Sequence, residues 1–118
     1  MRLTEISYGT AKPIESYGPG FFRLDGHILR GACLITPWDA GPWGGLEDTA
    51  TPVSLTGRID VLFVGMGAEI AHVPLPFRAA LEEAGIGVEV MSSPAACRTY
   101  NVLLGEGRRI AVALLPVG

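Results

Sequence analysis

The sequence carries little positive charge. It has nine basic residues, of which Lys12 is the only lysine, against twelve acidic residues, and its net charge is −3 at neutral pH. The basic residues form no run longer than the pair Arg108 and Arg109. A protein that binds nucleic acid presents a continuous basic surface to the phosphates. The charge therefore argues against nucleic acid as a partner.

Cysteine and histidine are scarce as well. Cys33 and Cys97 lie far apart without C-x-x-C spacing, and the two histidines are His27 and His72. This pattern predicts reduced, buried thiols and neither a disulfide nor a zinc site. The acidic residues are scattered along the chain, so no cluster of metal ligands is expected. We expect neither a metal nor another cofactor.

Long hydrophobic runs are also missing. Apolar stretches such as IAVALLPV near the end stop far short of the roughly 18 residues that a transmembrane helix needs. Glu5 stands where a secretion signal would need an apolar core. From the sequence we expect a cytoplasmic protein without a transmembrane segment.

The apolar content of the chain suffices for one domain over residues 1–118. Hydrophobic residues make up 48% and charged residues 18%, as in a globular protein with its own core. In the first third, Asp25 and Gly26 stand between two apolar segments, and this dipeptide is a strong signal for a tight hairpin turn. We predict strands at about 20–24 and 27–35.

The second half alternates between strand and helix patterns. IDVLFVG (59–65) predicts a buried strand, and PLPFRAALEEAG (74–85) predicts a helix with Pro76 in its first turn. A strand at 88–91, a helix after it and a last strand, RIAVALLP, complete the order β-α-β-α-β. This order predicts a single three-layer α/β domain with a central mixed, mostly parallel sheet and an N-terminal β-hairpin.

The two halves are joined by TPWDAGPWGGLEDTATP, residues 36–52. Its glycine and proline content predicts a long irregular loop. The loop carries Trp38 and Trp43, for which two interpretations stand. The indole rings cover the core from its rim, or they form an aromatic anchor for a partner.

A candidate crevice follows from the predicted strand order. GMGAE (65–69) and SSPAACR (92–98) each follow a predicted strand, and the carboxyl ends of parallel strands meet at one edge of a sheet, where ligands bind. Ser93 before Pro94 predicts the start of a helix that Ser93 caps, because its oxygen can accept from a free backbone N–H. The free N–H groups at such a helix start favour an anion. The candidate ligand-binding residues are Gly65, Gly67, Ser92, Ser93, Arg98, Thr99 and Tyr100.

Several residues of this crevice have a plainer interpretation. Arg98 pairs with a ligand, with a partner, or with an internal acid such as Glu69 or Glu106. Cys97 and Tyr100 follow the spacing of an inward helix face, and no histidine has a spacing that would activate the thiol. The glycines lack the third member of a dinucleotide fingerprint, because position 70 is Ile70. We identify no catalytic residue.

The longer motifs resemble a known family. The segments GFFRLDGHILRGACLITP, IDVLFVGMG, EAGIGVEVM and SPAACRTYNVLLGEGRRIAVALLP are similar to the domain-of-unknown-function family that includes mitochondrial complex I assembly factor 3. The resemblance covers nearly the whole chain. It implies a three-layer α/β fold with a mixed sheet and, for the mitochondrial member, help in assembling respiratory NADH dehydrogenase. Because the sequence shows no mitochondrial presequence, we expect a bacterial member. It brings no catalytic residues.

Two hypotheses for function follow. The first is a non-enzymatic assembly or interaction factor with a protein partner, and it predicts an exposed apolar surface that includes Trp38 or Trp43. The second is a small enzyme or a domain that binds an anion or small molecule in the crevice formed by residues 65–67 and 92–99. A homo-oligomer is compatible with either hypothesis.

Overall fold

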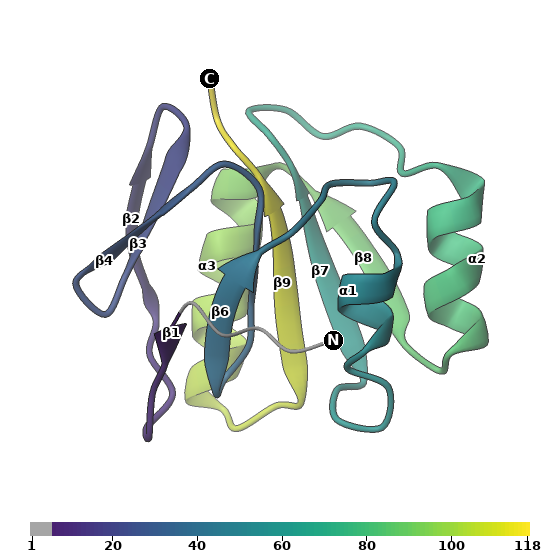
Figure 1. Cartoon of the computed structure of the whole chain (residues 1–118), viewed down its shortest axis with the longest axis horizontal. Coiled ribbons are helices and arrows are strands. Elements are labelled where there is room, and N and C mark those ends of the chain that lie inside the picture. The colour runs from purple at the N-terminus through teal and green to yellow at the C-terminus, as the bar shows by residue number, and fades with distance from the viewer. Residues whose placement is uncertain (1–5) are drawn as a thin grey trace.

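The structure, a computed structural model, describes residues 6–118 and places them in two β-sheets and three helices (Figure 1). The larger sheet has the strand order β1 (Ile6–Ser7), β6 (Asp39–Pro42), β5 (Cys33–Ile35), β9 (Ile110–Leu115), β7 (Val61–Met66), β8 (Gly87–Met91). The smaller sheet has the order β2 (Ile14–Gly18), β3 (Phe21–Leu24), β4 (His27–Arg30). The helices are α1 (Ala50–Val53), α2 (Leu75–Glu83) and α3 (Ser93–Gly105).

The larger sheet is mixed, as predicted. β9 pairs in parallel with β7, and β7 with β8, and these two ladders are the longest in the sheet. The remaining ladders, which link β9 to β5, β5 to β6 and β6 to β1, are antiparallel. β9 therefore joins the two halves of the chain. Its buried run from Ile110 to Leu114 is apolar throughout because both faces of the sheet are covered there.

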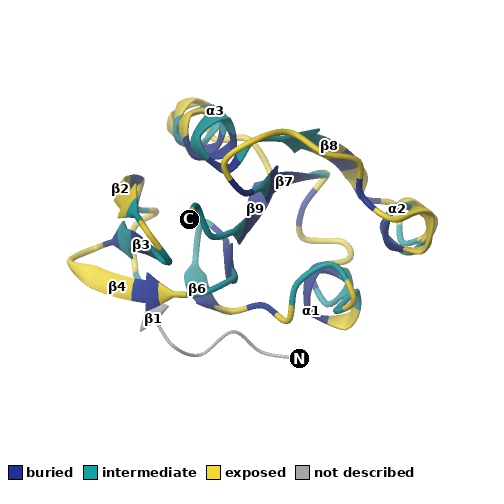
Figure 2. Cartoon of the chain, turned by 90° about the horizontal axis from the view of Figure 1, so that it is seen from above, coloured by how far each residue is buried: buried dark blue, intermediate teal, exposed yellow. Residues whose placement is uncertain are grey.

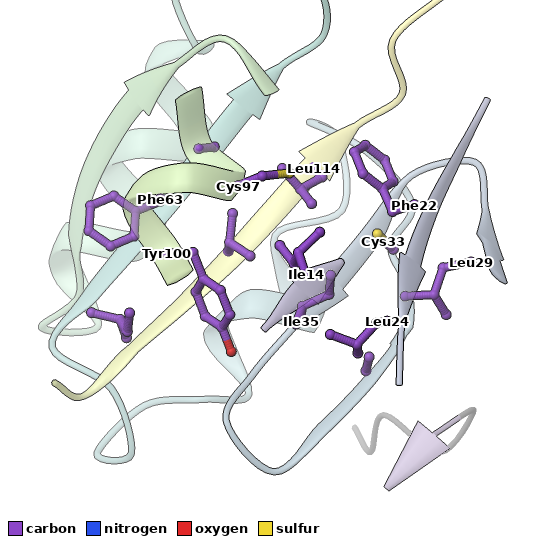
Figure 3. Packing of buried hydrophobic residues seen from close by; sticks show 14 residues of the cluster. Ile14, Phe22, Leu24, Leu29, Cys33, Ile35, Phe63, Cys97, Tyr100 and Leu114 are labelled. Atoms are coloured by element: carbon purple, nitrogen blue, oxygen red, sulfur yellow. The ribbon is translucent and has the colours of Figure 1, made fainter. Parts of the chain in front are cut away.

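Two hydrophobic clusters lie on the two faces of this sheet. One face is covered by α3 and by the smaller sheet, which contributes Phe22, Leu24 and Leu29 (Figure 3). The other face is covered by α1 and α2, with Phe77 and Leu81 of α2 in the second cluster. Seen from above, α3 and α1 stand on opposite sides of β9 and β7 (Figure 2). The predicted three-layer α/β arrangement is confirmed.

The predicted hairpin forms with the expected turn. Asp25 and Gly26 have φ values of 51° and 76°, as a tight turn with two left-handed residues requires, and β3 pairs with β4 across them. The single strand expected at 27–35 is wrong. Gly31, with φ of 77°, bends the chain there, so that β4 belongs to the smaller sheet and β5 to the larger.

The second half follows the predicted order closely. Pro76 lies in the first turn of α2, and Gly85, with φ of 83°, follows its C-terminus. The long irregular loop expected at 36–52 is wrong in part, because it contains β6 and the short helix α1. The side chain of Thr36 accepts hydrogen bonds from the N–H groups of Trp38 and Asp39, and this turn lets β6 fold back on β5.

Candidate functional site

The crevice predicted beside β7 is filled by Ser93. The hydroxyl of Ser93 accepts from the N–H of Gly67 at 2.9 Å and donates to the carbonyl of Leu115 at 2.6 Å, while its own N–H donates to the Gly67 carbonyl at 2.7 Å. Ser93 has no exposed surface. A Cβ at Gly65 would lie 2.7 Å from the Ser93 hydroxyl oxygen and 2.8 Å from its Cα. Ser93 thus ties the start of α3 to the ends of β7 and β9.

The cap of α3 is Ser92, and the prediction that Ser93 caps this helix is wrong. The Ser92 hydroxyl accepts from the N–H of Ala95, and its backbone is extended, as an N-cap requires. The two adjacent serines therefore divide two tasks. One satisfies a free N–H group of the helix, and the other joins three separate segments of the chain.

Arg98 and Thr99 line a depression to which Gly65 and Gly67 do not contribute. Together with Val102 and Leu103 they line this shallow depression of about 260 Å³, and all four residues belong to α3. Arg98 is exposed and makes no ion pair with any residue in the range 6–118. The internal-acid interpretation of Arg98 is therefore wrong. Binding of a ligand to these crevice residues stays a prediction.

Cys97 and Tyr100 belong to the core between α3 and the two sheets (Figure 3). Burial raises the pKa of the Cys97 thiol to about 11, although neighbouring Arg98 opposes this shift. Burial, followed by the charge of Tyr8, also raises the pKa of Tyr100, whose hydroxyl is the one buried side-chain polar atom without a hydrogen-bond partner in the described residues. Neither group is prepared for proton transfer near neutral pH.

Asn101 has a role that the sequence did not reveal. Its side-chain amide donates to the carbonyl of Ile14 at 2.9 Å and accepts from the N–H of Ile14 at 2.8 Å. This pair of hydrogen bonds fixes the start of β2 against α3 and so places the smaller sheet. Of the run from Cys97 to Asn101, therefore, Cys97 and Tyr100 pack in the core and Asn101 joins α3 to the smaller sheet.

The tryptophan loop presents less aromatic surface than predicted. Trp43 is only 4% exposed, its ring centre lies 6.0 Å from that of Phe77, and its indole N–H donates to the carbonyl of Asp48. The exposure expected of Trp43 as a partner anchor is wrong, because the indole fills the core between β6 and α2. Trp38 is half-buried, with the guanidinium carbon of Arg58 3.9 Å from its ring centre.

Asp48 holds this loop in place. Its carboxylate accepts from the N–H groups of Gly44 and Thr51 and from the Thr51 hydroxyl. Burial opposes ionisation of Asp48, but the hydrogen bonds outweigh it and hold the pKa of the carboxyl below its usual value. The position of Trp43 is thus set by a charged network on the same loop.

A groove that the sequence analysis missed lies between the end of β7 and the start of α2. It has a volume of about 470 Å³ and is lined by Ile70, Ala71, His72, Val73, Leu75, Arg78 and Val90. Figure 1 shows the segment after β7 running over the end of the sheet to α2. Ile70 is 68% exposed and Leu75 is 79% exposed, the highest values among the large hydrophobic residues of the described chain.

Arg78 borders this groove and is already engaged. Its guanidinium donates to the carbonyl of Val88 at 3.2 Å and lies 3.4 Å from the carboxylate of Glu82.

Within residues 6–118 no group of three or more histidine, cysteine, aspartate or glutamate side chains could hold a metal ion. In the same range, no helix has the length and apolar character needed to span a bilayer.

The fold and the groove define a small three-layer α/β protein with an open apolar surface at the end of its parallel strands. The family model described as "Protein of unknown function (DUF498/DUF598)" matches residues 14–115. The chain belongs to this family, and the resemblance stated from the sequence is confirmed.

Similar proteins extend over nearly the whole chain. An uncharacterized protein of Rhodobacter capsulatus is 49% identical over 99% of this chain and 94% of its own length. The NADH dehydrogenase (ubiquinone) 1 alpha subcomplex assembly factor 3 of Danio rerio is 34% identical over 95% of this chain and 67% of its own length. A crystal structure described as an outer membrane protein from Bartonella henselae superposes with a TM-score of 0.84 at 35% identity, covering 96% of this chain and all of that one.

Proposed function

We propose that this protein is a non-enzymatic interaction factor that helps to assemble respiratory NADH dehydrogenase. The observation that carries the proposal is the groove with its exposed rim residues Ile70 and Leu75. Large apolar side chains that gather at a hollow in the surface are typical of sites that bind other proteins. The kinship to proteins named as assembly factors supports the choice of target.

The chemistry of the groove favours binding over catalysis. Five of its seven lining residues are apolar, and His72 and Arg78 carry the only polar side chains among them. The guanidinium of Arg78 is held by Val88 and Glu82, so it is not paired with His72 as an acid and base would be. A cytoplasmic location and a contribution of Trp38 to partner binding are further parts of this proposal and rest on the sequence.

The test is a substitution at the rim with a matched control. Leu75→Asp places a charge in the groove, and an acid is well tolerated there because Leu75 is the first residue of α2. Val102→Asp is the control, since Val102 is 62% exposed on α3, away from the groove. Tagged chains are recovered from detergent-treated native cells, and NADH dehydrogenase subunits are quantified by mass spectrometry.

We expect Leu75→Asp to reduce recovery of these subunits at least about tenfold, because the charge would have to be desolvated on binding. Val102→Asp should recover them as the wild type does. Equal recovery by the two variants, with the wild type clearly binding, would remove the groove from the proposal.

A further inference from the structure

The outer edge of the larger sheet is unpaired at β8. Among residues 6–118, β8 pairs with β7 alone and is the last strand of the sheet. The N–H of Gly87 donates to the carbonyl of Asp60 just before β7, so the backbone of Gly87 faces β7. Because backbone direction alternates along a strand, the N–H and C=O groups of Val88 and Val90 face outward.

This edge leads directly into the groove. Val90 is both an edge residue and a lining residue, and Leu75 and Ile70 continue the apolar surface beyond it. Natural proteins protect a free edge with charge, proline or a covering segment. Here two charged residues protect part of the edge: Arg78 occupies the carbonyl of Val88, and Glu89 carries a charge on the strand itself. Leu75 and Ile70 instead expose apolar surface beside the rest of the edge and so favour contact with a partner.

We infer that β8 accepts an extended segment of a partner protein as an additional strand, with apolar side chains of that segment in the groove. The inference rests on the proposed function and names the kind of partner surface that the groove recognises. Main-chain hydrogen bonds to Val88 and Val90 supply the pairing, and alternate side chains supply the specificity.

The charge of Glu89 selects the occupant. Val88 and Val90 point to the face that α2 covers, so Glu89 points to the opposite face, where it is exposed and makes no ion pair within the described residues. A basic residue on the added strand opposite Glu89 complements it. The segment therefore alternates apolar residues toward the groove with basic residues toward Glu89.

The same residue disfavours a second copy of this chain as the occupant. Antiparallel pairing of two β8 strands over their full length, Gly87 to Met91, places Glu89 opposite Glu89 of the other copy. Like charges directly opposite each other destabilise a strand pair. The edge is thus open to a basic segment and closed to its own duplicate.

Arg78 competes with an added strand for this edge. Its guanidinium occupies the Val88 carbonyl that an added strand needs, and Glu82 holds it there. A binding segment must displace it. Arg78→Met keeps the aliphatic stem that lines the groove and removes the donor, so this variant should bind an added strand more tightly than the wild type.

The probe is a capped synthetic peptide, Thr-Val-Lys-Val-Lys-Val-Thr, added up to about 1 mM to the isotope-labelled full chain. Amide spectra and hydrogen exchange report on Val88 and Val90. Two further peptides carry N-methyl groups, one on its valines and the other on its lysines. Only alternate amides of an added strand face β8, so one methylated peptide should lose binding and the other should keep it. A peptide with glutamate in place of lysine tests the charge.

We expect slower exchange at the Val88 and Val90 amides, and at least about tenfold weaker binding of the glutamate peptide because it faces Glu89. Glu89→Lys should reverse the preference between the two peptides. Arg78→Met should tighten binding of the lysine peptide.

Equal binding of both methylated peptides, no binding of the lysine peptide, or protection of Val88 through self-association would each overturn the inference. These outcomes are separate from the recovery of NADH dehydrogenase subunits. If Leu75→Asp abolishes recovery while both methylated peptides bind alike, the proposed function stands and strand addition fails.

Discussion

Ser93→Ala should destabilise the fold far more than its position at a helix start suggests. The substitution removes a hydroxyl that accepts from the Gly67 N–H and donates to the Leu115 carbonyl. Gly67 is buried, so its N–H cannot recruit water in place of the serine oxygen. An orphaned buried donor costs about 1–3 kcal/mol, and the half-buried Leu115 carbonyl adds a smaller amount.

The expected loss is therefore about 2–4 kcal/mol in the free energy of unfolding. For a domain of this size it corresponds to a drop of roughly 10 °C in melting temperature. Urea unfolding monitored by circular dichroism and a thermal melt measure both quantities. Ser92→Ala is the matched control, since loss of a helix cap with one weak hydrogen bond should cost about 1 kcal/mol.

Equal losses in the two variants would refute this reasoning. They would mean that the contacts of Ser93 with Gly67 and Leu115 add nothing beyond a helix cap. If Ser93 instead served a ligand, the unliganded variant would keep its stability and lose only binding. The comparison of adjacent serines therefore separates the structural role from the predicted binding role.

Two further predictions concern the same helix. Iodoacetamide should label Cys97 at neutral pH at least about a hundredfold more slowly than a free thiol, because burial raises the pKa of Cys97 to about 11. The labelling rate should rise with pH as the thiolate forms. Rapid labelling of the folded chain at pH 7 would contradict this prediction. Arg98→Ala should change the free energy of unfolding by no more than about 0.5 kcal/mol, because Arg98 is exposed and makes no ion pair with the residues that the structure describes. A loss of about 3–5 kcal/mol, as for a broken buried pair, would show that Arg98 has an internal partner.

The parts of the fold that local signals encode were predictable from the sequence. Asp25 and Gly26 specify their turn through backbone conformation alone, and Pro76 and Gly85 mark the two ends of α2 in the same way. The apolar run of β9 indicates a strand buried on both faces. These elements depend on residues close in sequence, so a short window of sequence contains the information.

The tertiary contacts were not predictable in this way. The side-chain amide of Asn101 bonds to Ile14, 87 positions earlier in the chain, and no local pattern connects the two residues. Ser92 and Ser93 are the same residue type beside the same proline, and only the position of Gly67 and Leu115 decides which of them becomes the buried tie. The glycine-rich neighbours of Trp43 leave two interpretations open, and the contact of its ring with Phe77 of α2 decides between them.

The groove was likewise not predictable from local sequence. The proline-rich segment HVPLP (72–76) leads from β7 to α2, and proline content alone does not indicate which part of the fold such a segment covers. In the structure this segment leads into α2 and leaves Ile70 and Leu75 exposed in one groove with Val90 of β8, a strand that pairs with β7 alone among residues 6–118. A central strand and an edge strand of the same sheet can both be apolar. The valines at positions 88 and 90 therefore do not indicate from the sequence that their backbone N–H and C=O groups face away from the sheet. Strand order has to be known before an open edge and an exposed apolar loop can be combined into one binding surface.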